Sequence, residues 1–241
     1  MRFFFALFFT VASSIIAQAA KTDKPNIIVI MADDLGYGDI GCYGAKPENL
    51  KTPNIDRLAA NGLQFTNGYC SASTCTPTRF SFLTGKYAFR QNNTGIAPPN
   101  GPAIIQPGVE TLPSLLKSAG YTTAVIGKWH LGVPDKFHPT KTGFDYFMGF
   151  RTGGNKVTNP TLEVKGKNQK VEGFTYDILT DDALEFIERN QKKTFLLCLH
   201  YRAPHAAWMP QPESDRKPFD KLDPMIPNPD YPNLDVARVK R

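Results

Sequence analysis

Cys75 opens a segment that reads Cys-Thr-Pro-Thr-Arg, with Arg79 four residues after the thiol. A helix that begins near Cys75 would place these two side chains one turn apart. The start of such a helix also offers free backbone N–H groups and the positive end of the helix dipole, which together attract anions. The segment therefore predicts an anion site, although an isolated cysteine near a turn is usually a buried structural residue.

Further reactive side chains follow three apolar segments that resemble buried strands. Asp33 and Asp34 end the first segment, Lys128 and His130 lie at the end of the second, and His205 follows the third. Ligands of open α/β sheets bind beyond the carboxyl ends of the strands. Taken singly, paired aspartates often cap a turn, and a lysine or histidine after a strand is usually solvated.

The coincidence of these groups favours one site at one edge of a sheet. Carboxylates would suit a hard cation, cationic groups an anion, and imidazoles a proton transfer. In an extended segment, Lys128 and His130 would share one face and Trp129 would take the other.

The elements that must position these groups alternate along the chain. Hydrophobic patterns predict strands at 26–34, 63–69, 121–132 and 194–201, and helices at 52–62, 76–85, 108–120 and 175–191. This alternation predicts an α/β fold whose mostly parallel sheet is flanked by helices on both faces. Residues 150–174 are expected to form an excursion over the sheet, and the Pro-rich tail from about residue 210 has no predicted element.

The N-terminus has the pattern of a secretory signal peptide. A basic start precedes the apolar run 3–16, which ends at Ala17-Gln18-Ala19. We expect cleavage of residues 1–19 and a secreted or periplasmic protein; an uncleaved anchor is the alternative. No later segment is long and apolar enough for a stable membrane span.

Charge and cysteine spacing disfavour two other classes of function. The formal net charge is +6, but the basic residues are scattered and form no stripe with interleaved aromatic residues, so nucleic acid is not an expected partner. The four cysteines have no zinc-finger spacing, which disfavours a zinc site.

The motifs, in this order, resemble those of the sulfatases in the alkaline phosphatase superfamily. Their signature C-x-P-S/T-R followed by L-T-G stands here as Cys75–Arg79 and Leu83-Thr84-Gly85. Four further segments are similar to family segments: PNIIVIMADDLGYGDIGCYG, TPNIDRLAANGLQFTNGY, GYTTAVIGKWHLG and YRAPH. The resemblance covers roughly residues 24–209 and implies an alkaline phosphatase-like fold.

The resemblance also implies an activity, the hydrolysis of sulfate esters. In this family a formylglycine-generating enzyme oxidises the cysteine, here Cys75, to an aldehyde whose hydrate attacks sulfur and later expels sulfate. By the same resemblance, Arg79 orients the nucleophile, and Lys128 and His205 hold the sulfate and protonate the leaving oxygen. His130 contacts the hydrate and assists its breakdown.

The resemblance assigns Asp33, Asp34 and the modified Cys75 to one Ca²⁺ ion, with Mg²⁺ as the alternative. The family supplies two more ligands after a later buried strand, and no such strand is recognisable here. Since Ca²⁺ takes about six to eight oxygens, we expect residues 20–241 to be the N-terminal part of a catalytic domain. The sheet would then be incomplete on its C-terminal side, with weak activity and weak Ca²⁺ affinity for this chain alone.

Two alternatives to a sulfatase remain at this point. The same fold could hydrolyse phosphodiesters or phosphonates, or the chain could be a truncated, inactive protein that binds anions. The sequence does not say whether an aryl, carbohydrate or steroid sulfate is the substrate.

Overall fold

The computed structural model describes residues 24–46, 50–92, 94–98, 103–207 and 209–220. The strands are β1 (Ile27–Asp33), β2 (Thr122–Lys128), β3 (Tyr146–Phe150), β4 (Thr161–Val164), β5 (Lys167–Lys170) and β6 (Phe195–Pro204). The α-helices are α1 (Pro53–Ala60), α2 (Cys75–Thr84), α3 (Leu112–Ser118), α4 (Thr175–Arg189) and α5 (Glu213–Arg216). Short 3₁₀ turns lie at Tyr37–Asp39, Gly41–Tyr43, Ala88–Arg90, Asp135–Phe137, Pro139–Lys141 and Lys217–Phe219.

These strands form one sheet in the order β1-β6-β2-β3-β4-β5. The strands β1, β6, β2 and β3 are parallel, and the hairpin β4–β5 is antiparallel at the far edge. The α/β fold with a mostly parallel sheet is therefore confirmed.

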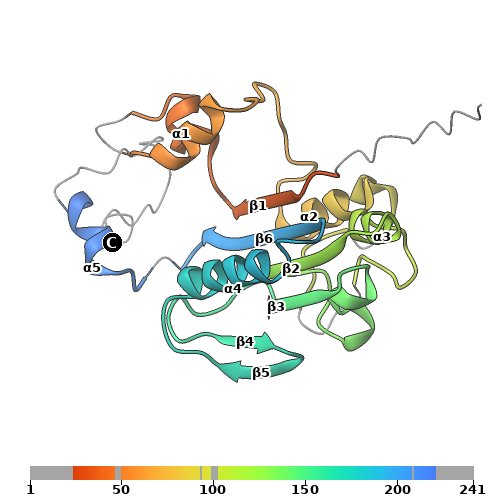
Figure 1. Ribbon diagram of the computed structural model, residues 1–241. Helices are drawn as coiled ribbons and strands as arrows, with labels where there is room; N and C mark the ends of the chain where they lie inside the picture. The colour runs from red at the N-terminus through yellow and green to blue at the C-terminus, as the bar shows by residue number, and fades with distance from the viewer. Residues whose placement is uncertain (1–23, 47–49, 93, 99–102, 208, 221–241) are drawn as a thin grey trace, which may run out of the picture.

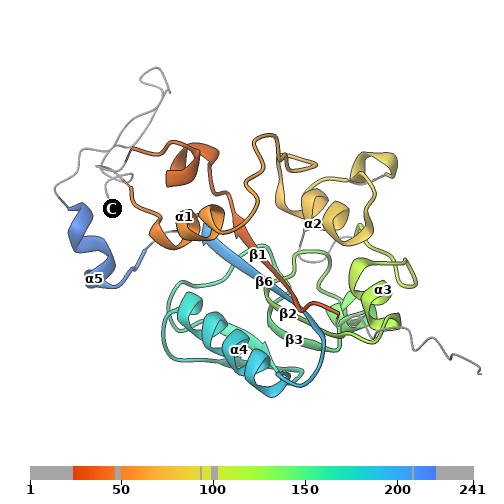
Figure 2. The ribbon, with the colours of Figure 1, turned by 45° about the horizontal axis from the view of Figure 1, so that its top comes forward.

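Helices cover both faces of the sheet, as predicted (Figures 1 and 2). On one face, α2 and α3 pack over a core that includes Phe80, Val125 and Leu196. On the other face, α4 buries Leu179, Ala183 and Phe186. Their spacing of four and three residues produces the apolar stripe of an amphipathic helix.

Local sequence explains where the two helices on the first face begin and end. Pro77 lies in the first turn of α2, where its missing N–H costs nothing, and Gly85 ends the helix with a φ of 66°. Helix α3 begins at a capping box in which Thr111 and Ser114 bond each other's backbone N–H.

The centre of the sheet admits no side chain at Gly127 of β2. This residue has a φ of +108°, and a Cβ built on it would lie 2.1 Å from the carbonyl oxygen of His200 in β6. Glycine is required there because the neighbouring backbone approaches too closely for any other residue.

The β1 edge of the sheet differs from its centre. Within the described residues, β1 pairs only with β6, and Ile28 and Ile30 are exposed. Helix α1 buries none of its residues and stands off the sheet, beyond the C-terminal end of β1 (Figure 1).

Several expectations were wrong or lie outside the described residues. The segment 63–69 is irregular, and Leu63, Phe65 and Tyr69 are exposed. Strand β3 was not predicted, the excursion 150–174 contains the hairpin β4–β5, and α5 lies in the tail. The predicted signal peptide at 1–19 and residues 221–241 lie outside the described part. No described helix meets the length and apolarity needed to cross a bilayer.

Candidate active site

The first turn of α2 fixes the position of Cys75. Thr74, the N-cap residue, makes no side-chain hydrogen bond to the helix, so the positive end of α2 stays uncapped beside the thiol. The fully buried Thr76 hydroxyl donates to the carbonyl oxygen of His130 over 3.0 Å and accepts from the N–H of Ala97, also over 3.0 Å. Thr76 therefore ties Cys75 to two loops distant in sequence.

The predicted meeting of the three strand ends is confirmed. The strands β1, β6 and β2 are parallel neighbours, with Asp33 in register with Pro204 and Gly127 in register with His200. The carboxylates of β1, the lysine that ends β2 and the histidine that follows β6 therefore lie at one edge of the sheet.

A buried charge cluster forms at this edge. The Lys128 ammonium donates to the Asp33 carboxylate over 2.5 Å, and the Arg79 guanidinium lies 3.7 Å from the other oxygen of Asp33. Arg79 also donates to the carbonyl oxygen of Lys128 over 2.9 Å. All three side chains are almost completely buried. Two cations face one carboxylate, so the cluster has a net positive charge that an anion would offset.

Arg79 connects this cluster to the helix start. Burial lowers the pKa of Arg79 from its ordinary value, and the acidic groups of Asp33, Cys75 and Asp34 oppose that effect. Arg79 therefore lies close enough to the thiol and to both carboxylates for their charges to act on it.

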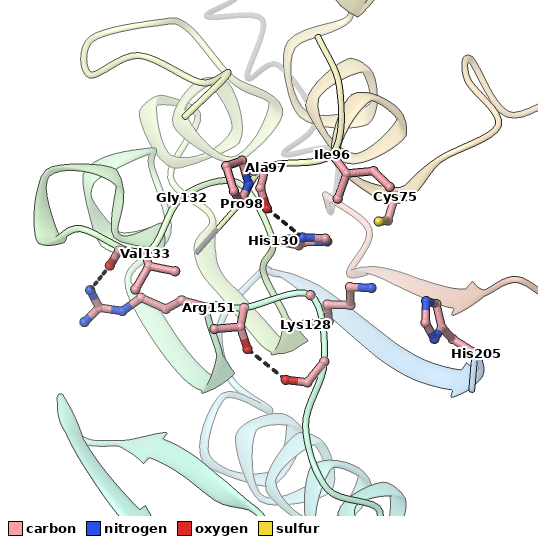
Figure 3. Close-up of a pocket in the computed structure, with 13 residues that line it drawn as sticks. Cys75, Ile96, Ala97, Pro98, Lys128, His130, Gly132, Val133, Arg151 and His205 are labelled. Carbon is pink, nitrogen blue, oxygen red and sulfur yellow. Dashed lines mark hydrogen bonds between the residues drawn. The ribbon is translucent and has the colours of Figure 1, made fainter. Parts of the chain in front are cut away.

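A cavity of about 530 Å³ opens beside the cluster, and four of the predicted residues line it: Cys75, Lys128, His130 and His205. Their side chains converge from α2, the end of β2 and the end of β6 (Figure 3). Its volume lies within the range of ordinary small-molecule sites, about 300–1,000 Å³. Arg79, Asp33 and Asp34 do not line this cavity, but Arg79 and Asp33 both contact Lys128, which does.

His130 is held as a neutral imidazole. Burial, followed by the positive charge of Lys128, lowers the pKa of His130 to about 4. Its Nε2 lies 3.2 Å from the carbonyl oxygen of Ala97, which can only accept, so Nε2 carries the proton. The buried Nδ1 has no partner among the described residues and keeps a free lone pair. His130 has a φ of 55°, so it reaches the cavity through a left-handed turn and not through the extended segment we predicted.

Gly153 sets the place of that imidazole ring. A Cβ built on Gly153 would lie 2.6 Å from Cε1 and 2.7 Å from Nε2 of His130. The ring therefore occupies space that only glycine leaves free.

His205 lies at the mouth of the cavity with about a third of its side chain exposed. Its Nε2 is 3.7 Å from a carboxylate oxygen of Asp34, whose side chain is 64% exposed. His205 can therefore meet a group that enters from solvent.

The oxygen atoms near Cys75 are of the chemical type that binds a hard cation. Carboxylate oxygens are the ligands that Ca²⁺ and Mg²⁺ prefer, and Asp33 and Asp34 supply them beside the helix start. Lys128 and Arg79 bond Asp33 in the present arrangement. In the described ranges, no group of three or more His, Cys, Asp or Glu side chains is placed to hold a metal.

Sequence reasoning missed the residues that follow β3. Arg151, Thr152 and Gly153 line the cavity from the end of this fourth parallel strand. The signal was present, since Phe147, Met148 and Phe150 form an apolar run that ends in Arg-Thr-Gly-Gly.

Comparisons with known proteins identify the family of this chain. The profile of the Sulfatase family matches residues 25–225. Two relatives come from Bacteroides thetaiotaomicron. An N-acetylgalactosamine-6-O-sulfatase is 56% identical over 116 residues, which cover 48% of this chain and 22% of the relative. An N-acetylglucosamine-6-O-sulfatase is 36% identical over 207 residues, which cover 84% of this chain and 35% of the relative.

A solved structure extends the likeness to the fold. The crystal structure of Ps i-CgsB in complex with k-i-k-neocarrahexaose superposes with a TM-score of 0.77 at 32% identity, covering 84% of this chain and 50% of that one. The chain thus spans about half of that structure, and a smaller share of the two Bacteroides relatives. The match of the family profile over residues 25–225, most of the chain's length, shows that this chain belongs to the sulfatase family.

Proposed function

We propose that the protein hydrolyses sulfate esters in the cavity that Cys75 lines. One observation carries the proposal: the thiol at the start of α2 shares this cavity with Lys128, His130 and His205. The cavity thereby joins a nucleophile position, a buried cation and two imidazoles, the groups that transfer of a sulfuryl group to the enzyme requires.

Lys128 and Arg79 supply the positive charge. Lys128 lines the cavity and Arg79 does not, so Lys128 is the nearer cation for the sulfate oxygens once its ammonium shares or leaves Asp33, and Arg79 acts at longer range. Positive groups fixed before the reaction stabilise the negative charge that builds up on the sulfuryl oxygens.

The two histidines divide the proton transfers. His130 is neutral near pH 7 and its Nδ1 has no partner among the described residues, so we assign to it the acceptance of a proton from the nucleophile, although its low pKa makes it a weak base. His205 lies at the mouth, where the alcohol part of a substrate would leave, and we assign to it the protonation of the leaving oxygen.

Two additions to the chain belong to the proposal. A formylglycine made from Cys75 would supply a hydrated aldehyde as the nucleophile, and this requires a formylglycine-generating enzyme as a partner. A divalent cation, Ca²⁺ or alternatively Mg²⁺, held by Asp33 and Asp34 would lower the pKa of a bound hydroxyl. Asp33 would have to release Lys128 or share its oxygens, and the modified Cys75, water and further groups would have to complete the ligand set.

We also propose that residues 1–19 direct export and that residues 20–241 form the N-terminal part of the catalytic domain. The mature protein would then meet its substrate outside the cytoplasm, in the periplasm or in the medium, without a stable membrane span.

Side-by-side assays test the reaction. The whole chain, co-expressed with a formylglycine-generating enzyme and supplied with Ca²⁺, is given 4-nitrophenyl sulfate and, separately, the mono- and diesters of 4-nitrophenyl phosphate. We expect faster turnover of the sulfate ester. Faster turnover of a phosphate ester would assign the site to phosphoryl transfer, and sulfate binding without turnover would identify an inactive anion-binding protein.

A further inference from the structure

A second cavity of about 490 Å³ adjoins the first. Val133, Arg151, Thr152 and Gly154 line both cavities, so the two cavities are neighbours and a ligand longer than one sugar residue could contact both. We call it the Arg151–Glu163 cavity, after the ion pair in its wall.

Arg151 is the fixed element of this wall. Its Nε donates to Glu163 over 2.7 Å, and one terminal nitrogen donates to the carbonyl oxygen of Val133 over 2.8 Å and to Asp135 over 2.6 Å. Its guanidinium points away from Cys75 and Lys128 (Figure 3). Because Glu163 also binds the Nε2 of His138 over 2.8 Å, the wall is organised before any ligand arrives.

The hairpin β4–β5 contributes a polar face to the same cavity. Glu163 and Asn168 are register partners, and Thr161 lies two residues before Glu163, so the three side chains share one face. Leu162 takes the opposite face and is fully buried in the core under α4. The Thr161 and Asn168 side chains line the cavity and have no hydrogen-bond partner within the described ranges.

The lining selects one chemical class of ligand. Arg151 and Asn168 bring donors to the lining, Asp135 and Glu163 bring acceptors, and Thr161 can do both. A flat apolar group would cover these polar atoms without pairing them, at a cost of about 1–3 kcal/mol for each buried group. Sugar hydroxyls can pair with both kinds.

The charges around the two cavities restrict the class of ligand further. Two carboxylates face one guanidinium in the Arg151–Glu163 cavity, whereas the cluster beside Cys75 has an excess of positive charge. The second cavity should therefore disfavour another sulfate group.

We propose that the Arg151–Glu163 cavity binds an uncharged sugar residue joined to the one that carries the sulfate, so that the substrate is a sulfated oligosaccharide. This inference rests on the proposed function. It assigns to Asn168 and Thr161 a part in substrate specificity, since they contact the sugar and lie apart from the reacting atoms.

Calorimetry on the whole chain, produced without the formylglycine-generating enzyme so that Cys75 stays a thiol, tests the inference. The probes are 4-nitrophenyl sulfate, N-acetylglucosamine 6-sulfate, and disaccharides in which a neutral hexose is joined to either side of that sugar. We expect one disaccharide to bind about tenfold more tightly than the monosaccharide, which corresponds to about 1.4 kcal/mol. A second sulfate on the added hexose should weaken binding.

The variant Asn168→Leu should remove most of the tenfold gain and leave the affinity for 4-nitrophenyl sulfate unchanged. Gln169→Leu is the matched control, because Gln169 pairs with Leu162 and is exposed on the other face of the hairpin. Equal disaccharide affinities in the two variants, or no gain from the second sugar, would overturn the inference alone. Failure of 4-nitrophenyl sulfate to bind would overturn the proposed function and the inference with it.

Discussion

One row of apolar side chains crosses the sheet and passes from solvent into the core. Ile30 of β1, Leu199 of β6 and Ile126 of β2 are register partners on the same face, and they are 62%, 6% and 0% exposed. The cover that α4 gives to this face therefore stops at β6. We call β2 and β6, which α4 covers on this face, the covered region. We call β1 and α1 the uncovered region.

The site contains residues from both regions, and the strands that carry these residues differ in how far they are buried. Lys128 ends a strand that is packed on both faces, whereas Asp33 ends a strand that is half exposed yet is itself only 5% exposed. We infer that Asp33 is held in place chiefly by its ion pairs with Lys128 and Arg79, and less by the packing of β1.

The largest expected effect follows from breaking that link. Lys128→Met leaves the buried Asp33 with only the longer contact to Arg79, so we expect the free energy of unfolding to fall by about 3–5 kcal/mol. Lys117→Met is the control: its ion pair with Asp145 has the same length, 2.5 Å, but is partly exposed, and its loss should cost less than about 1 kcal/mol. Urea denaturation measures both; equal losses would refute our view of Asp33.

A matched pair of truncations tests the row itself. Ile126→Ala opens a cavity in the covered region and should cost about 2–5 kcal/mol. Ile30→Ala, in the same row, should change stability by no more than about 0.5 kcal/mol because its side chain is exposed. A large loss for Ile30→Ala in the same denaturation experiment would show that β1 is covered in solution.

A change of pH should test the burial of His200, which lies in the covered region. Burial, followed by the charge of Arg79, lowers the pKa of His200 in β6 from 6.5 to about 3. The unfolded state therefore binds a proton that the folded state refuses, and the stability from this group is lost as the pH falls from about 6.5 toward 3. Between pH 7 and 4.5, the wild type should lose about 2.5 kcal/mol more than His200→Asn. If the wild type and His200→Asn lost the same stability over this pH range, His200 would not be buried as a neutral imidazole.

The smallest effect should concern function alone. Gly153→Ala places a methyl group against the ring of His130, and a displaced catalytic group can lower activity by about tenfold or more. Gly154→Ala is the control, because the nearest atom to its Cβ, Nε of Arg202, is at 3.6 Å. We expect both variants to melt like the wild type, with reduced sulfate-ester turnover only in Gly153→Ala; equal activities would remove Gly153 from the site.

The parallel strands that lead to the site were the part of the fold most readily predicted from sequence. Continuous apolar runs identified β1, β2 and β6, and the rule that ligands bind past parallel strands brought Asp33, Lys128 and His205 together. Strand β5 escaped prediction because its four residues are polar and exposed, so they show no alternation. The segment 63–69 misled because its apolar residues face solvent.

Two features of the site could not be read from spacing. The pairing of Lys128 with Asp33 joins residues 95 positions apart, and no sequence pattern distinguishes a lysine that binds a carboxylate from one that only lines a cavity. The contact of Gly153 with His130 depends on the left-handed turn at His130, which side-chain alternation in a strand does not foresee.

Turnover of 4-nitrophenyl sulfate by Cys75→Ala and Cys70→Ala, in the whole chain co-expressed with a formylglycine-generating enzyme, tests the central claim most directly. Cys70 is exposed and lies outside the cavity, so its loss should leave the rate unchanged. Removal of the nucleophile should lower kcat by about 10³-fold or more, as in other enzymes that use a covalent nucleophile. A Cys75→Ala protein that retains the rate of Cys70→Ala would contradict the account.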